Sequence, residues 1–122
     1  MANVELLDEN NIPEELKEIF LELKEKHGEV PIPMRALANH PEYFKTVLNK
    51  MDTVMGSDAL DTKTKLALAY TISVLNNCEF CIKLYAQQLH DAGFTDKQFI
   101  EIIAMIDLVG AMNHLNLSLI HI

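Results

Sequence analysis

The sequence predicts an all-α protein that forms a single helical domain over residues 1–122, with about six helices. Glycine and proline are scarce, at four residues each, and they lie between segments whose apolar residues recur at helical spacing. No stretch longer than a few residues alternates apolar and polar side chains as a half-buried strand would. The length of 122 residues suits one domain of ordinary size.

The first half of the chain predicts three helices. Pro13 suits the first turn of a helix and Gly28 suits the position past its end. Prolines at positions 31 and 33 require extended or turning backbone, and a short helix over about 34–39 follows. Pro41 opens the next helix and Gly56 with Ser57 ends it. The apolar stripe of the first helix consists of Ile12, Leu16, Ile19, Phe20 and Leu23.

The second half predicts three more helices. Asp61 can cap a helix over about 62–76, and its charge-free stretch from residue 66 to residue 78 predicts burial nearly all round. Asn77 is the expected N-cap of a helix over 78–92 that Gly93 closes. Thr95 with Gln98 forms the pattern of a capping box, which opens the last helix.

The last helix is unusually apolar. No Asp, Glu, Lys or Arg follows Asp107, and apolar residues at 100, 105 and 108 lie off the core stripe. Such a segment would expose a large patch in a small soluble chain, so we expect it to pack against another subunit. The alternative is a core helix within one chain, with a frayed end. The predicted core stripe is Phe99, Ile102, Ile103, Ile106 and Val109 or Gly110.

The chain is acidic, with 18 Asp plus Glu against 10 Lys plus Arg and a net charge of −8. Phosphate binding needs a clustered basic surface, which the single arginine, Arg35, does not supply. We therefore expect no nucleic acid partner, and an anionic membrane surface is disfavoured for the same reason.

Targeting signals are also not expected. No basic-then-apolar segment opens the chain, which argues against a secretory signal. The longest charge-free runs are shorter than the ~18–20 apolar residues of a spanning helix. With 49% hydrophobic and 23% charged residues the chain can bury a core. We expect a soluble, cytoplasmic protein with no membrane partner.

The two cysteines, Cys78 and Cys81, form a Cys-x-x-Cys pair, a spacing that chance gives roughly one time in sixty. Residues three apart on a helix share a face, so the sulfurs can approach within disulfide reach. A helix N-terminus favours thiolate over thiol, most of all at Cys78. The pair therefore predicts redox chemistry, in which one sulfur attacks and the other resolves the mixed disulfide; spacing alone does not say which attacks first.

Tyr85 lies on the same helical face as both cysteines and can donate a hydrogen bond or pass a proton. The alternative is a core aromatic residue whose hydroxyl reaches water. Glu79 points away from Cys78, and His90 suits the surface. Zinc would need four ligands, and the sequence offers no second cysteine or histidine pair at ligand spacing, so we expect no metal and no cofactor. An inert buried dithiol is the remaining alternative.

Five segments together resemble the carboxymuconolactone decarboxylase family, and within it the alkylhydroperoxidase D-like branch. The resemblance runs from about Gly28 to Gly110, and the Cys-x-x-Cys after a long apolar helix is its most specific part. The segments are Gly28-Glu29-Val30-Pro31, Arg35 to Pro41, Leu60 to Asn76, Asn77-Cys78-Glu79-Phe80-Cys81 and Ala92-Gly93-Phe94-Thr95.

The resemblance implies an all-helical domain that assembles into trimers or hexamers. It also implies that Cys78 and Cys81 cycle between dithiol and disulfide while reducing peroxides or a partner's disulfide. Reducing equivalents would come from lipoyl groups or thiol proteins. The branch typically has a glutamate twelve residues before the first cysteine and a histidine four after the second. Here these positions are Leu66 and Tyr85, so the usual proton relay is replaced.

We therefore predict a thiol–disulfide oxidoreductase with peroxidase activity of the antioxidant, peroxiredoxin type, with Cys78, Cys81 and Tyr85 as its site. One alternative is a carboxymuconolactone decarboxylase-like lyase, in which Arg35 could hold a substrate carboxylate, although a structural ion pair is the simpler interpretation of Arg35. The other alternative is a non-enzymatic oligomeric module on the same scaffold.

Overall fold

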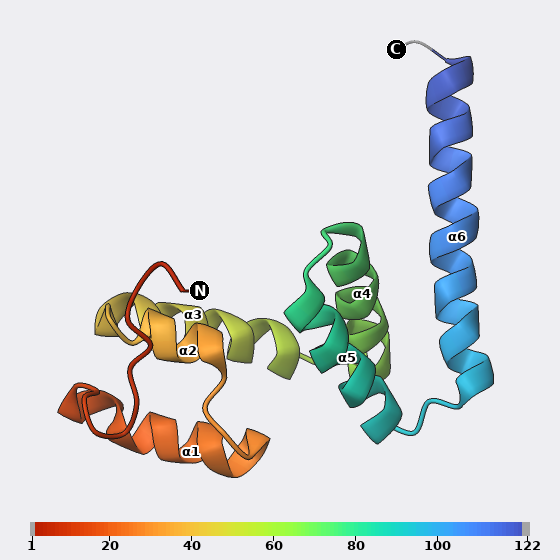
Figure 1. Ribbon diagram of the computed structural model, residues 1–122. Helices are drawn as coiled ribbons and strands as arrows, with labels where there is room; N and C mark the ends of the chain where they lie inside the picture. The colour runs from red at the N-terminus through yellow and green to blue at the C-terminus, as the bar shows by residue number, and fades with distance from the viewer. Residues whose placement is uncertain (1, 121–122) are drawn as a thin grey trace. The chain divides into compact units, whose positions relative to one another are not determined.

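The computed structural model describes residues 2–120, and all of its regular elements are helical (Figure 1). The prediction of an all-α fold with about six helices is confirmed. The elements are a 3₁₀ helix η1 (Glu14–Leu16), α1 (Lys17–His27), α2 (Ile32–Leu37), α3 (Pro41–Gly56), α4 (Thr62–Leu75), α5 (Glu79–Asp91) and α6 (Asp96–Leu119). They divide into two compact units, unit 1 (Met1–Ser57) and unit 2 (Asp58–Ile122). A single domain stays a prediction.

Unit 1 closes around one apolar cluster. Its largest fully buried side chain, Phe44 of α3, packs against Phe20 of α1 with ring centroids 6.1 Å apart. Residues before, within and after α1 and α2 all contribute side chains to this cluster, and their packing stabilises the arrangement of the short helices. The buried members are Leu7, Ile12, Leu16, Phe20, Met34, Ala38 and Phe44.

The boundaries in unit 1 differ slightly from those predicted. Ile12 lies before the first helix, because its backbone N–H donates to the Asp8 carbonyl (3.0 Å) in a preceding turn. Gly28 ends α1 with a φ of 83°, a left-handed conformation that favours glycine. The short helix α2 begins at Ile32 rather than at residue 34, because Pro33 is tolerated in a first turn.

The side chain of Arg35 binds backbone carbonyls rather than a carboxylate. Its Nε donates to the Leu7 carbonyl (3.0 Å) and its Nη2 to the Leu6 carbonyl (3.3 Å). Asn39 donates to the Glu5 carbonyl at 2.7 Å. The predicted ion pair of Arg35 is therefore corrected to a different structural role, in which the side chain anchors the N-terminal segment to α2.

In unit 2, α4 packs along α5, and residues of the first half of α6 pack against the same apolar cluster. The buried residues are Leu66 and Tyr70 of α4 and Leu89 of α5. The ring of Tyr70 meets Phe99 edge-on, with centroids 5.0 Å apart. Asp61 caps α4 by accepting from the Thr64 N–H (2.7 Å), as predicted. The predicted capping box between Thr95 and Gln98 is also confirmed.

Helix α4 is buried on one face only, which contradicts the prediction of burial nearly all round. Leu66, Tyr70 and Ser73 are buried. The opposite face is exposed, with Leu68 at 49%, Ile72 at 55% and Leu75 at 67%. The charge-free stretch of α4 from residue 66 could be buried all round only if other elements packed on every side of it, and unit 2 supplies packing partners on one side.

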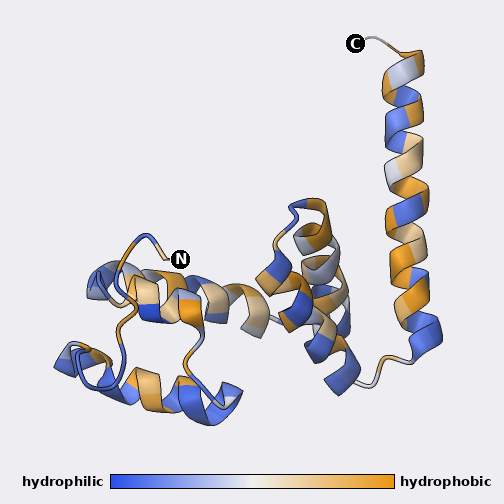
Figure 2. Cartoon of the chain, viewed as in Figure 1, coloured by the Kyte–Doolittle hydropathy of each residue, from blue (hydrophilic) through white to orange (hydrophobic). Residues whose placement is uncertain are grey.

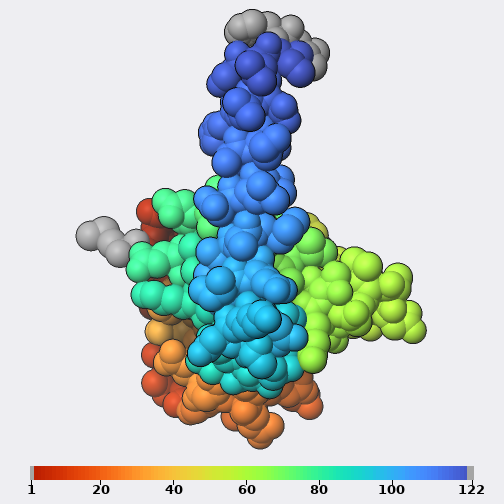
Figure 3. All heavy atoms as spheres, turned by 90° about the vertical axis from the view of Figure 1, so that its right-hand side faces the viewer, coloured from red at the N-terminus to blue at the C-terminus, as the bar shows by residue number. Residues whose placement is uncertain are grey.

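The C-terminal half of α6 is similarly apolar and exposed. Phe99, Ile102 and Ile106 pack on the core of unit 2, as predicted. Ile103 and Val109, assigned to the same stripe, are exposed instead. Figure 2 shows hydrophobic and hydrophilic residues alternating along α6, and Figure 3 shows its C-terminal half extending beyond the rest of unit 2. The remaining exposed hydrophobic residues from 108 onward are Leu108, Met112, Leu115, Leu117, Leu119 and Ile120.

Within the described residues, α6 is long and apolar enough to cross a membrane by length and composition alone. The charge-free run of the sequence begins after Asp107, whereas α6 starts at Asp96 and continues through Asp107, so the helix is longer than that run. This finding is weak evidence for a membrane, because core helices of soluble proteins pass the same test.

Candidate functional site

The cysteines lie at a sharp turn between α4 and α5. The N–H of Cys78 donates to the Ser73 carbonyl (2.9 Å) and the N–H of Asn77 donates to the Val74 carbonyl (3.1 Å). Asn77 has a φ of 56°, a left-handed conformation. This bonding pattern is the Schellman motif, which ends a helix with a left-handed residue that is usually Gly and sometimes Asn.

The predicted role of Asn77 as the N-cap of the second helix is therefore wrong. Asn77 closes α4, and Cys78 itself takes the N-cap position of α5, which begins at Glu79. The Cys78 carbonyl accepts the first helical hydrogen bond of α5, from Ile82 at 2.9 Å. The sulfur of Cys78 consequently lies at the end of the helix where backbone N–H groups are unpaired and the macrodipole is positive.

Both cysteines are free thiols and half-buried. Hydrogen bonds from the Cys81 side chain and from the Cys81 backbone N–H hold the pKa of Cys78 below its ordinary value. The same side-chain hydrogen bond, followed by burial and the charge of Cys78, raises the pKa of Cys81. The first proton to leave the pair therefore leaves its charge on Cys78, at the positive end of α5.

Tyr85 is half-buried one turn beyond Cys81 and packs against the core of unit 2. Burial raises the pKa of Tyr85, and negative charge on Cys81 and Cys78 raises it further. The hydroxyl thus stays protonated at neutral pH and can act as a hydrogen-bond donor near the sulfurs. The structure brings the three predicted site residues together on one helix.

Other polar residues that the sequence offered are engaged elsewhere. Glu79 pairs with Lys83 at 3.2 Å on the exposed side of α5. His90, at the far end of α5, stacks on Phe99 with ring centroids 5.0 Å apart. Leu66, at the position of the family's usual glutamate, is 5% exposed in the core of unit 2. Among residues 2–120, no group of three His, Cys, Asp or Glu side chains could hold a metal ion.

Ser73 is a buried residue at the cysteine turn that the sequence did not predict, and its backbone carbonyl contacts Cys78. The Ser73 Oγ donates to the Ala69 carbonyl (2.7 Å) while the Ser73 carbonyl holds the Cys78 N–H. The signal that could have found it is the Asn76-Asn77 pair after a long helix. Asparagine tolerates the left-handed conformation, and a left-handed residue 77 allows the Schellman motif, in which the carbonyl of residue 73 accepts from residue 78.

Comparison with known proteins decides the family. The model of the carboxymuconolactone decarboxylase family matches residues 41–120, about two thirds of the chain. The chain belongs to this family. The matched range contains α3 to α6, and therefore the whole cysteine turn. None of the curated proteins compared with the chain matches it.

A solved structure shows which branch of the family the fold resembles. The alkylhydroperoxidase AhpD core from Rhodospirillum rubrum is 30% identical, and the match covers 100% of this chain and 94% of that one, with a TM-score of 0.86. The predicted resemblance to the family and to the alkylhydroperoxidase D-like fold is confirmed.

Proposed function

We propose that this chain is a thiol–disulfide oxidoreductase that reduces peroxides through Cys78 and Cys81. The observation that carries the proposal is the pair of free thiols at the start of α5, with Cys78 at the N-cap and Cys81 in the first turn. The lowered pKa of Cys78 and the raised pKa of Cys81 support it. A thiolate next to a protonated thiol is the arrangement needed for attack followed by resolution.

In the first step the Cys78 thiolate attacks one oxygen of a hydroperoxide. An S–O bond forms, the O–O bond breaks, and Cys78 becomes a sulfenic acid. The sulfur loses two electrons, and the departing alkoxide takes a proton to become an alcohol. In this proposal the Tyr85 hydroxyl, whose raised pKa keeps it protonated, donates a hydrogen bond to the charge that develops near the sulfurs.

In the second step the Cys81 sulfur attacks the sulfur of the Cys78 sulfenic acid. An S–S bond forms, the S–O bond breaks, and hydroxide leaves with the Cys81 proton as water. An external dithiol, either a thiol protein or a lipoyl group, then returns two electrons and two protons. The proposal places the protein in the cytoplasm, where reducing conditions favour this return of the disulfide to two thiols.

The residues at the two usual proton-relay positions, Leu66 and Tyr85, determine the rate of peroxide reduction that we expect. A positioned general base is typically worth ~10²–10⁴-fold, and the two positions that usually supply it hold a buried leucine and a protonated tyrosine. We therefore expect slower peroxide turnover than that of relatives with an intact relay, with the helix N-terminus and the Cys81 hydrogen bonds maintaining the thiolate.

The test is a thiol titration after exposure to an organic hydroperoxide. We expect both thiols of each chain to disappear and to return with a lipoyl-type dithiol, while Cys78→Ser leaves its single thiol free. Cys81→Ser should instead accumulate sulfenic acid at position 78, trapped with dimedone. Two thiols that stay free in excess peroxide would overturn the proposal.

The role of Tyr85 has a test of its own. Tyr85→Phe removes the hydroxyl and should slow thiol oxidation about tenfold, the effect of one hydrogen bond to a charged group. The matched control is Tyr43→Phe, which removes an exposed hydroxyl from unit 1. Equal rates for the two variants would leave Tyr85 as a core aromatic residue.

The proposal includes assembly into a homo-oligomer, a trimer or a hexamer, through the apolar C-terminal helix. Support comes from the exposed hydrophobic residues of the C-terminal half of α6, which contains no Asp, Glu, Lys or Arg after Asp107. Covering a patch of this kind by a second copy of the chain removes apolar area from water.

A lyase acting on a carboxylated lactone remains the second candidate, because the name of the matching family includes decarboxylase activity. It predicts that the double variant Cys78→Ala, Cys81→Ser still consumes such a lactone. If this double variant no longer reduces peroxide and also does not consume the lactone, the result favours the oxidoreductase. Inactivity of the wild type in both assays would favour a non-enzymatic oligomeric module.

A further inference from the structure

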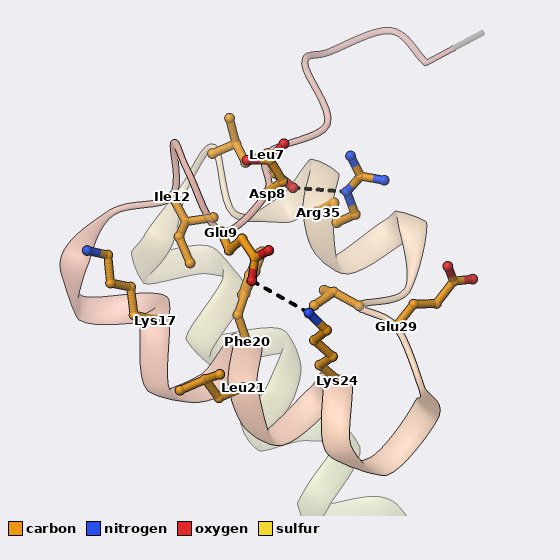
Figure 4. A pocket seen from close by; sticks show the side chains of 11 residues that line it. Leu7, Asp8, Glu9, Ile12, Lys17, Phe20, Leu21, Lys24, Glu29 and Arg35 are labelled. Atoms are coloured by element: carbon orange, nitrogen blue, oxygen red, sulfur yellow. Dashed lines mark hydrogen bonds and ion pairs between the residues drawn. The ribbon is translucent and has the colours of Figure 1, made fainter.

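Unit 1 contains a pocket that the thiol chemistry does not use. Its volume is about 390 Å³, near the lower end of the roughly 300–1,000 Å³ typical of small-molecule sites. It lies between the N-terminal loop, α1 and the segment leading into α2 (Figure 4). The apolar part of its wall comes from Leu7, Ile12, Phe20, Leu21 and Val30.

Lys24 is the cation of this pocket that is best placed to meet a ligand. Three cationic residues, Lys17, Lys24 and Arg35, line the pocket, but Lys17 pairs with Glu14 at 2.6 Å and Arg35 donates to backbone carbonyls. Two of the three acidic residues that also line it are directed elsewhere. The Asp8 carboxylate accepts from the Asn10 N–H (2.8 Å) within its own loop, and in Figure 4 the Glu29 carboxylate points away from Lys24.

The remaining acidic residue, Glu9, faces Lys24 across the pocket at 3.6 Å. Both side chains are more than half exposed, and an exposed ion pair of this kind contributes little stability. A ligand carboxylate could therefore replace the Glu9 carboxylate on Lys24 at small cost, while Arg35 holds the loop in place through the Leu6 and Leu7 carbonyls.

We propose that this pocket binds a small amphiphilic anion, an alkyl or aryl carboxylate whose apolar body lies against Phe20 and Ile12 and whose carboxylate pairs with Lys24. The apolar wall supplies binding energy by excluding water, and Lys24 supplies the preference for a negative head group. The site is independent of the cysteines, so its failure would not affect the proposed thiol chemistry.

The test uses decanoate, below its micellar concentration, with the full chain and methyl-detected NMR. We expect saturable shifts at the methyl groups of Ile12 and Leu7. Decanol, which has the same chain without the charge, should bind more weakly. Equal binding of decanol and decanoate, or shifts confined to α6, would overturn the proposal.

Three variants locate the head group. Lys24→Met should weaken decanoate binding about five- to tenfold, the effect of one charge-assisted hydrogen bond, and Glu9→Gln should strengthen it because the competing carboxylate is gone. Lys26→Met is the matched control, an exposed lysine of α1 outside the pocket, and should change nothing. Decanoate binding that is equal in Lys24→Met and Lys26→Met would contradict the proposed head-group contact.

Discussion

The two units of this chain bury their apolar residues to different extents. Unit 1 encloses a cluster drawn from its loop, η1, α1, α2 and α3, and anchors its N-terminal segment with Arg35 and Asn39. Unit 2 has three buried apolar residues in its cluster, and most of the exposed large hydrophobic side chains of residues 2–120 belong to it. Unit 1 therefore has the core of a self-contained fold, whereas unit 2 has surfaces suited to a partner.

The two cysteines and most of the exposed apolar residues therefore belong to the same unit. The exposed face of α4 ends at Leu75, three residues before Cys78, and Phe80 between the cysteines is also exposed. A partner that covered this face would lower the water content near the thiols, which strengthens electrostatic interactions there. The proposals of assembly and of thiol chemistry thus concern neighbouring parts of one unit.

The largest expected effect is the loss of assembly on placing a charge in the apolar half of α6. Leu115→Glu would put a carboxylate into the proposed contact, where burial without a partner is costly. We expect sedimentation or light scattering to show an oligomer for the wild type and a monomer for the variant.

The matched control for that experiment is Asn113→Glu, which adds the same charge to an already polar position of the same helix. It should leave the mass unchanged. A wild type that sediments as a monomer, or a Leu115→Glu variant that keeps its mass, would remove the argument that the exposed residues of unit 2 serve assembly.

A smaller effect should come from a cavity in the core of unit 1. Phe44 is fully buried, so Phe44→Ala should lower the free energy of unfolding by about 3–5 kcal/mol. Urea unfolding followed by circular dichroism measures it, with Lys50→Ala on the exposed side of α3 as the control. A loss below about 1 kcal/mol would mean that unit 1 is not the well-packed unit described above.

The smallest of these effects concerns the start of α6. Thr95→Ala removes the hydroxyl that accepts from the Gln98 N–H at 3.2 Å, and should cost about 1 kcal/mol. Thermal unfolding of this variant beside Lys97→Ala, an exposed neighbour outside the capping box, separates the cap from general helix propensity. Equal midpoints would show that packing alone determines where α6 begins.

The helices could be predicted because their boundary signals are local. Asp61, Thr95 with Gln98, and Gly28 each act within a few residues, and each was found where the sequence placed it. The burial of α4 could not be predicted in the same way, because the number of faces that are covered depends on which other elements pack there. Leu68, Ile72 and Leu75 are as hydrophobic as the buried residues of α4, so the sequence alone does not show that they are exposed.

At the candidate site, the pairing of the cysteines followed from their spacing, but their exact helical positions did not. Asparagine is favoured both at N-caps and in the left-handed conformation past a helix end, so Asn77 fitted two roles. The structure assigns it the second one, which moves Cys78 to the N-cap. The sequence predicted the lowered pKa of Cys78 from a helix N-terminus. The raised pKa of Cys81 depends on its hydrogen bond to Cys78 and was not predicted.

The account depends most directly on the charge of Cys78, which site-resolved alkylation can measure. The wild-type dithiol is treated with iodoacetamide across a pH series, and the labelling rate at each cysteine is read by peptide mass spectrometry. A lowered pKa means that the thiolate is present at lower pH, so we expect the inflection for Cys78 below that of a free cysteine peptide and the inflection for Cys81 above it. An inflection for Cys78 at or above that of the free peptide would contradict the account.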